Sequence, residues 1–394
     1  MRGDPRRTDP GHDHPGHQRP ELAAVPASAR RRRVVVVTLA TLAAALAIVV
    51  VGIAAGSASL GPLDILRTLV GLGDAGDRLI VFQLRLPRVA AALLVGICLG
   101  LAGALTQTFA RNPLATPDIL GVTSGAAAGA VAAIVLGGGT YAIGTGLLGL
   151  GIPAVATVGG LATAAVVYGL SWRGGVESYR LILIGIGATA SLGGITSYLI
   201  AKAQITQAAD AAQWLVGSLS GVSWASVWPV AVVLAVVAPV ALGQSRALEV
   251  SLLGDEVSTG LGLAVQRHRL LVIVCAVLLS SAAVSASGPI EFVAFVAPQL
   301  ARRLAGTGRP PLPASALLGG LLVSAADILG RAVLPWQVPV GIVTAIVGAP
   351  YLIWLLCRSG DPGRPGGRAG ARGRRATGRR PGARDRTGSR ERTA

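Results

Sequence analysis

The sequence predicts an all-α integral membrane protein, a bundle of about ten transmembrane helices. Of its 394 residues, 52% are hydrophobic and 13% are charged, and the mean hydropathy is +0.64. Soluble domains carry about 25% charged residues, so a water-soluble enzyme is excluded. The chain also contains 54 glycines and only 4% aromatic residues, a composition typical of helices that pack closely in lipid. The third observation is a series of apolar segments long enough to cross a bilayer.

A bilayer core requires about 20 apolar residues per helix. The predicted spans, of which the eighth and ninth are short or contain proline, are 34–55, 88–109, 119–138, 150–171, 181–201, 225–243, 269–287, 290–305, 312–330 and 339–357. They define a transmembrane domain over 34–358. The flanking residues 1–33 and 359–394 are polar and rich in arginine, so we expect disordered basic tails.

The distribution of charge predicts which side of the membrane each loop faces. Residues 1–33 hold 8 arginines against 4 acids and residues 358–394 hold 12 against 3, so the tails carry +13 of the net +17. Arginine is enriched in short cytoplasmic loops. We therefore expect a multi-pass protein of the cell membrane with both termini in the cytoplasm, and we attribute the basic charge to topology instead of nucleic-acid binding.

Two connections are too long to be simple turns. Residues 56–87 form an outer segment with helical apolar spacing, and residues 244–268 form an inner loop whose apolar positions recur every three or four residues. The inner loop is a candidate docking site for a cytoplasmic partner. An ordinary amphipathic connector would show the same pattern.

Several kinds of chemistry are excluded by the residues present. The single lysine, Lys202, lies outside any phosphate-binding Gly-Lys-Ser/Thr sequence, so another polypeptide must bind ATP if ATP drives the work. The three cysteines are isolated, and no metal-ligand cluster or catalytic constellation occurs, so we expect neither an enzyme nor a cofactor. The spans contain only Glu291 and Asp327 as acids, which weakens an ion-coupled secondary carrier. Asp327 lies four residues before Arg331, which predicts an ion pair.

Arg85-Leu86-Pro87-Arg88 lies at the outer mouth of a span, and Arg331 falls on the same side. Because Pro87 starts or breaks the helix, both guanidinium groups are expected near the surface. Exposed arginines of this kind form paired hydrogen bonds with the carboxylates of a docking protein. Contact with lipid headgroups is an equally good interpretation of the sequence alone.

Four blocks of sequence resemble the FecCD-type permeases of bacterial ABC importers for iron-siderophore complexes and cobalamin. The blocks are Arg85-Leu86-Pro87-Arg88 with Arg111-Asn112-Pro113-Leu114, Trp214-Leu215-Val216-Gly217, Gly288-Pro289-Ile290-Glu291 through Pro298-Gln299 with Arg302-Arg303, and Ala326-Asp327 with Arg331 and Val338-Pro339-Val340-Gly341. They occur in family order over about residues 34–358. The resemblance implies the permease fold of the cobalamin importer.

The resemblance also implies partners and roles for particular residues. It implies two cytoplasmic ATP-binding subunits, a second permease subunit that is identical or paralogous, and an extracytoplasmic substrate-binding lipoprotein. Docking of that lipoprotein is assigned to Arg85, Arg88 and Arg331, and a cytoplasmic gate to Asn112 and Leu114. Coupling to the ATPases is assigned to Leu253, Gly254, Asp255, Glu256, Leu261 and Gly262.

The resemblance favours one substrate class over two others. Val296-Ala297-Pro298-Gln299 and Ala301-Arg302-Arg303 are similar to the siderophore branch of the family, so we expect an iron-siderophore complex as substrate. Cobalamin or haem, carried by the same mechanism, remains the alternative. Glu291 stands where the family usually has Gly or Ala, and it could touch the substrate, the binding protein or a local arginine.

Overall fold

The structure is a computed structural model that describes residues 27–55, 61–137, 151–173, 175, 178–334 and 336–359. The chain divides into two compact units, Met1–Tyr351 and Leu352–Ala394, and the contacts described below lie within the first. Most of both predicted tails lies outside the described residues.

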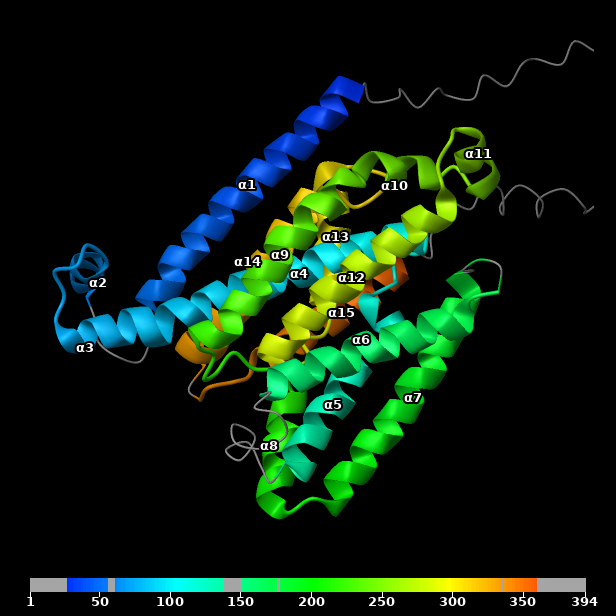
Figure 1. Ribbon diagram of the computed structural model, residues 1–394. Helices are drawn as coiled ribbons and strands as arrows, with labels where there is room; N and C mark the ends of the chain where they lie inside the picture. The colour runs from blue at the N-terminus through cyan, green and yellow to red at the C-terminus, as the bar shows by residue number, and fades with distance from the viewer. Residues whose placement is uncertain are drawn as a thin grey trace, which may run out of the picture. The chain divides into compact units, whose positions relative to one another are not determined.

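The regular elements of the described residues are helices (Figure 1). They are α1 (Ala27–Ala54), α2 (Pro62–Leu69), α3 (Ala75–Arg78), a π-helix (Leu79–Arg85), α4 (Leu86–Phe109), a 3-10 helix (Pro117–Leu120), α5 (Val122–Leu136), α6 (Ile152–Ser171), α7 (Ser178–Lys202), α8 (Ile205–Leu215), α9 (Trp224–Gly243), α10 (Ser245–Ser251), α11 (Asp255–Gly260), α12 (Val265–Ser287), α13 (Val293–Ala305), α14 (Leu312–Ile328), a second π-helix (Leu329–Val333) and α15 (Val340–Ser359).

A helix occupies each of the ten positions where the sequence predicts a span, so the all-α membrane fold is confirmed. Seven helices of the described residues are long and apolar enough to cross a membrane. The other three positions hold shorter helices, α5, α13 and the apolar part of α15. Helix α1 begins at Ala27 instead of residue 34, so Arg30 to Arg33 belong to its first turns.

Helix α4 is the centre of the larger group of helices, where it packs against α14, α12, α13 and α9 (Figure 1). Glycines allow this close approach, because a methyl group on Gly100 would overlap the carbonyl oxygen of Ser315, and one on Gly103 would overlap that of Ala294. Gly96 faces Gly319 in the same way. The small-residue spacing of this span therefore has a packing role.

A second group consists of α5, α6 and α7, which pack against one another and contact α12 through α5 and α6. Gly125 on α5 faces Gly159 on α6 with backbone nearly touching backbone. Gly185 on α7 meets the carbonyl of Ile119, whereas Gly187 has no neighbour within 4 Å of an added methyl group. Of these two glycines, Gly185 is the one at which packing leaves no space for a side chain.

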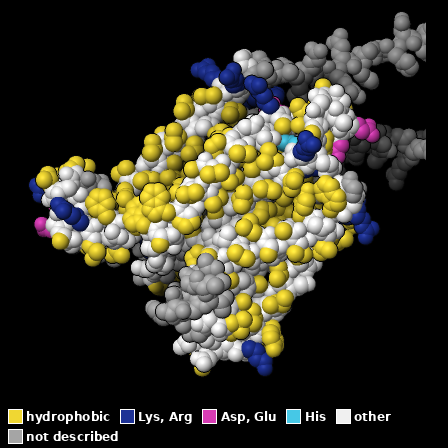
Figure 2. Space-filling view, viewed as in Figure 1, with side chains coloured by type: hydrophobic (Ala, Val, Ile, Leu, Met, Phe, Trp, Pro, Cys, Tyr) yellow, Lys and Arg dark blue, Asp and Glu magenta, His cyan; other side chains and the backbone are white. Residues whose placement is uncertain are grey.

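The outer surfaces of the helices are apolar, as a lipid-facing surface requires. Figure 2 shows hydrophobic side chains spread over the visible helices and basic side chains gathered near their ends. Exposed large side chains include Val35, Leu39, Leu46 and Val50 on α1, and Val232 and Val236 on α9. This distribution matches a multi-pass membrane protein.

Both long connections contain helices, as their apolar spacing predicts. The described part of the outer connection holds α2, α3 and the π-helix that leads directly into α4. The inner connection holds α10 and α11, joined by Leu252 to Gly254. Gly254 has φ of +101° and Gly262 has φ of +84°, backbone conformations that favour glycine.

Candidate functional site

The three predicted docking arginines lie near one another, and two of them, Arg88 and Arg331, bind Asp327, which is 2% exposed. Arg88 Nε donates to one carboxylate oxygen at 2.9 Å, and Arg331 Nε donates to the other at 2.9 Å. The second contact is the i,i+4 pair predicted from the sequence. A buried carboxylate requires such partners, so Asp327 holds α4 and α14 together through charge.

The same cluster holds the C-terminal end of α1. Arg85 Nη1 donates to the carbonyls of Ile53 at 2.9 Å and Ala54 at 3.3 Å, and Arg331 donates to those of Gly52 and Ala55. The last carbonyls of a helix have no partner within the helix and carry partial negative charge. Two arginines therefore cap α1. Arg331 is more than two hundred residues away from α1 in the sequence.

The expectation that all three arginines are exposed is wrong. Arg85 is 6% exposed, and the Arg88 and Arg331 side chains are 18% and 8% exposed. The π-helix before Leu86 precedes the contact of Arg85 with α1. The spacing of residues predicts the contact of Asp327 with Arg331, but not its contact with Arg88 or the acceptors that α1 supplies. Arg88 retains the most accessible guanidinium group of the three.

The predicted gate residues lie in a tight turn at the end of α4. The Asn112 side-chain oxygen accepts a hydrogen bond from the Leu114 backbone at 2.9 Å, and the Asn112 carbonyl accepts one from Ala115 at 3.1 Å. Leu114 is 43% exposed. The turn thus has a fixed backbone and presents an apolar side chain.

A buried amide network beside this turn was missed in the sequence analysis. Gln299 on α13 donates to the Gln107 side chain at 2.6 Å and to the Pro113 carbonyl at 2.9 Å. Gln107 donates to the Phe295 carbonyl at 3.1 Å, and Arg302 donates to Gln299 at 2.8 Å. Two glutamines within apolar spans are the signal that could have revealed it, since a polar group in lipid needs a partner.

Arg111 joins the gate turn to the inner loop. Its Nη2 donates to the Ser251 carbonyl at 2.6 Å and to the Asp255 carboxylate at 2.8 Å. Arg269 at the start of α12 also donates to both Asp255 oxygens, at 2.8 and 2.7 Å. Arg111 itself has φ of +49°, so the turn holds a non-glycine residue in the left-handed region. The structure thus brings the gate and the predicted coupling residues together through a residue to which the sequence assigned no role.

The Asp255 carboxylate is ionised at neutral pH. Partial burial raises its pKa, but the charge of Arg269 and the hydrogen bonds from Arg111 and Arg269 outweigh this effect and lower the pKa below the ordinary value. The stabilisation from these contacts is therefore present above the ordinary pKa of an aspartate and is lost only as pH falls through the lowered value.

The inner loop presents an apolar surface to its surroundings. Leu253, Val257 and Leu261 are 60%, 51% and 64% exposed, and Glu256 is exposed beside them. Ser258 is instead fully buried, with its hydroxyl bonded to the Val250 and Gly254 carbonyls. These exposed side chains form an apolar surface on the inner loop.

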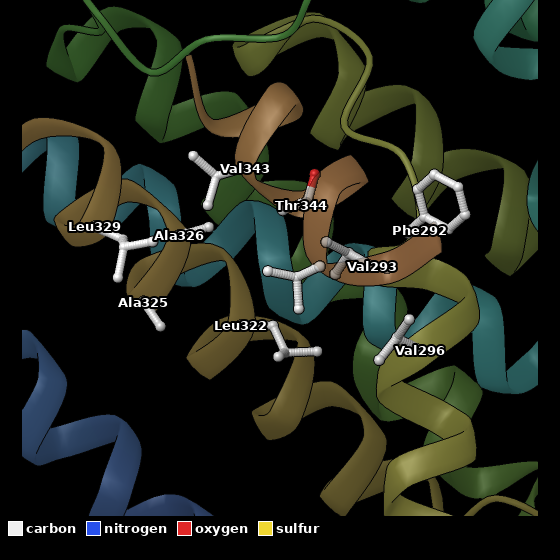
Figure 3. Close-up of a pocket in the computed structure, with 11 residues that line it drawn as sticks. Phe292, Val293, Val296, Leu322, Ala325, Ala326, Leu329, Val343 and Thr344 are labelled. Atoms are coloured by element: carbon white, nitrogen blue, oxygen red, sulfur yellow. The ribbon is translucent and has the colours of Figure 1, made fainter. Parts of the chain in front are cut away.

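A separate apolar cavity of about 170 Å³ lies between α13, α14 and α15 (Figure 3). Its labelled lining consists of carbon side chains, among them Phe292, Val296 and Leu322, and the oxygen of Thr344. No group of three or more His, Cys, Asp or Glu residues that could hold a metal occurs in the described part of the chain. The cavity is therefore lined by apolar groups and one hydroxyl, without a charged side chain that could bind an ionic ligand.

Residues 43–358 match the FecCD transport family. The chain belongs to this family. It is 40% identical to the ferric enterobactin transport system permease protein FepG of Escherichia coli (strain K12) over 309 residues, which cover 77% of this chain and 90% of the relative. It is 38% identical over 281 residues to the cobalamin import system permease protein BtuC of Halobacterium salinarum, covering 71% of this chain and 73% of the relative.

A solved structure has the same fold. It is a metal-chelate type ABC transporter in an inward-facing conformation, with a TM-score of 0.71 and 27% identity, and the match covers 82% of this chain and 98% of the other. Family membership makes this chain a multi-pass membrane permease, the component of an ABC importer that works with ATPase and substrate-binding partners. The resemblance drawn from the four sequence blocks is therefore confirmed.

Proposed function

We propose that the chain is the transmembrane permease subunit that carries an iron-siderophore complex into the cytoplasm. The observation that carries the proposal is the contact of Arg111 with Asp255, because it joins the gate turn directly to the loop predicted to receive the ATPase. The substrate class is supported by the ferric enterobactin relative, which matches over more of its length than the cobalamin relative does. The Val-Ala-Pro-Gln sequence before Leu300 also favours this branch.

The proposed complex contains two permease subunits, two cytoplasmic ATP-binding subunits and one substrate-binding lipoprotein. Both termini of the chain would lie in the cytoplasm. Consistent with this topology, residues predicted on one side lie together, because Arg111, Asp255 and Arg269 meet at one end of α4 and Arg88 and Arg331 meet at the other. The second permease subunit is an identical or paralogous chain.

Docking of the lipoprotein is proposed at the arginine cluster around Asp327. Arg88 would be the first contact for an incoming carboxylate, because it is the most accessible of the three and its guanidinium group already binds the Asp327 carboxylate. The partner's acid would share or replace the Asp327 contact. Arg85 and Arg331 would contribute positive charge and hold the end of α1 in position.

Coupling is proposed to run from the inner loop to the gate. The ATPase would seat on Leu253 and Leu261, with Gly254 and Gly262 providing the turns and Glu256 a polar contact. Movement of this loop would pull Asp255 and hence Arg111, which precedes Asn112 and Leu114. Packed elements with two discrete arrangements transmit such a displacement.

A binding-protein-dependent uptake assay in cells tests the substrate. A strain that lacks this permease, and that carries its ATPase and binding-protein partners, should regain uptake of a labelled ferric siderophore when the chain is restored. Excess unlabelled cobalamin or haem should not compete. Uptake of labelled cobalamin, blocked by unlabelled cobalamin and not by ferric siderophore, would contradict the proposed substrate and leave the permease role intact.

Cobalamin is the second candidate because of one observation, the relative from Halobacterium salinarum. Its identity is nearly as high as that of the ferric enterobactin relative, although its coverage is lower. The competition arms of the same assay separate the two candidates.

A further inference from the structure

A basic cavity of about 500 Å³ lies between the start of α1, helix α10 and the loop from α13 to α14. Its lining contains Arg30, Arg31 and Arg309 and one acid, Glu249. Arg33 adds positive charge nearby, because its guanidinium group lies beside Gly306, at the start of the same loop. A methyl group added to Gly306 would lie 3.1 Å from Arg33 Nη1. Figure 2 shows basic side chains gathered at this end of α1. The cavity therefore carries net positive charge.

Arg309 has hydrogen-bonding capacity that the protein leaves unused. Its Nε and Nη2 donate to Glu249 at 3.2 and 2.6 Å, while its Nη1 is buried without a hydrogen-bond partner. A buried N–H group without an acceptor is unfavourable. Glu249 thus holds Arg309 in place, and the exposed Arg30 and Arg31 leave the cavity with a positive charge that an anionic oxygen would neutralise.

We propose that this cavity binds the phosphate of an anionic phospholipid. Guanidinium groups bind phosphate through paired hydrogen bonds. Val34, Leu252 and Pro311 add apolar side chains to the lining, which also includes Thr307 and Gly308. From Val34 onward α1 exposes apolar residues, so the acyl chains would lie along Val35 and Leu39, which are 49% and 58% exposed. A soluble phosphate shares the headgroup chemistry but would leave this apolar surface uncovered.

The site can be distinguished from general attraction between arginines and lipid. Phosphatidylglycerol is titrated into the delipidated full chain in neutral detergent, and bound lipid is counted by native mass spectrometry. Arg31→Gln should weaken binding about fivefold, the effect of losing one charge-assisted hydrogen bond that solvent partly screens. Arg32→Gln is the matched control, because Arg32 is exposed, lies on the same turn and is not among the lining residues; it should bind as the unmodified chain does.

Equal losses in Arg31→Gln and Arg32→Gln would overturn the proposal, since general attraction does not distinguish neighbouring arginines. Arg309→Gln should weaken binding at least as much as Arg31→Gln, and the exposed Arg31 keeps the test valid if Arg309→Gln fails to fold. Phosphatidylcholine, with the same chains and no net charge, should bind more weakly, and equal binding would contradict an anion site. Displacement of phosphatidylglycerol by inorganic phosphate alone would identify a soluble phosphate as the ligand and overturn the lipid assignment.

Discussion

Asp327 determines how Arg88 and Arg331 can bind another carboxylate, because it already occupies both guanidinium groups. It binds Arg88 and Arg331 from two helices, while Arg331 and Arg85 also cap α1. Charge reversal at Arg88 would place a second carboxylate beside a buried one, which is unfavourable whether or not a partner docks there. A neutral substitution therefore tests docking more cleanly than a reversal.

We expect Arg88→Gln to weaken binding of the substrate-binding protein about tenfold, because a charge-assisted hydrogen bond contributes about 1.5–3 kcal/mol and solvent lowers this value. Affinity is measured in nanodiscs and normalised to the permease present. Arg67→Gln, which removes the same charge from an exposed position on α2, is the control. Equal affinity of the two variants would indicate that docking occurs elsewhere.

Arg85→Ala should act on stability instead. It would leave the Ile53 carbonyl without its donor in a buried position, which costs about 1–3 kcal/mol. The melting temperature in detergent should fall, and Arg85→Lys should restore part of the loss. An unchanged melting temperature would contradict the capping role of Arg85.

The Arg111–Asp255 contact makes a different prediction, because its side chains are 42% and 49% exposed. An exposed ion pair contributes at most about 1 kcal/mol to stability, so Arg111→Ala should fold normally. In the assembled transporter the variant should preserve ATP hydrolysis. The amount of substrate transported per ATP should fall about tenfold, a change of the size that a typical coupling free energy produces.

The control for this variant is Arg246→Ala, which removes an exposed arginine from α10 in the same loop. Its transport per ATP should equal that of the unmodified chain. Equal ratios in Arg111→Ala and the unmodified chain would contradict the coupling path while leaving the permease role untouched.

At the scale of elements, backbone contact between α4 and its neighbours controls the packing. Gly100 and Gly103 lie against the carbonyls of Ser315 and Ala294. Gly103→Ala should lower the free energy of unfolding by at least about 1–3 kcal/mol, because the added methyl group must displace the backbone at Ala294. Gly187→Ala, at a helix position with open space, should be neutral or slightly stabilising. Similar thermal unfolding of both variants would contradict the packing described for α4.

The inner loop can be placed relative to the membrane by labelling. A cysteine at Ser258 would be protected on either side, since that side chain is buried, so Leu261→Cys is the informative variant. In a background with exposed Cys357 replaced by serine, Leu261→Cys should resist impermeant thiol reagents in whole cells. Ile205→Cys on α8, where the side chain is 90% exposed, should react. The reverse pattern would overturn the topology.

At the scale of the whole molecule, the sequence was sufficient to predict the fold class and the positions of the helices, because hydropathy and glycine content are local properties. It also predicted the Asp327–Arg331 pair, whose partners are one helical turn apart. It could not predict that Arg331 caps α1 or that Gln299 contacts Gln107 and Pro113, because these contacts join residues that only the folded chain brings together. The exposure of Arg85 was mispredicted for the same reason.

The central claim is that this chain forms the path of an ATP-driven importer and that partner subunits supply the energy. The most direct measurement is accumulation of a labelled ferric siderophore in proteoliposomes containing the chain, its ATPase subunits and its loaded binding protein. We predict accumulation that requires ATP, the binding protein and the ATPase subunits together, and background ATP hydrolysis by the chain alone. Uptake by the chain alone, driven by an ion gradient without ATP, would contradict the account.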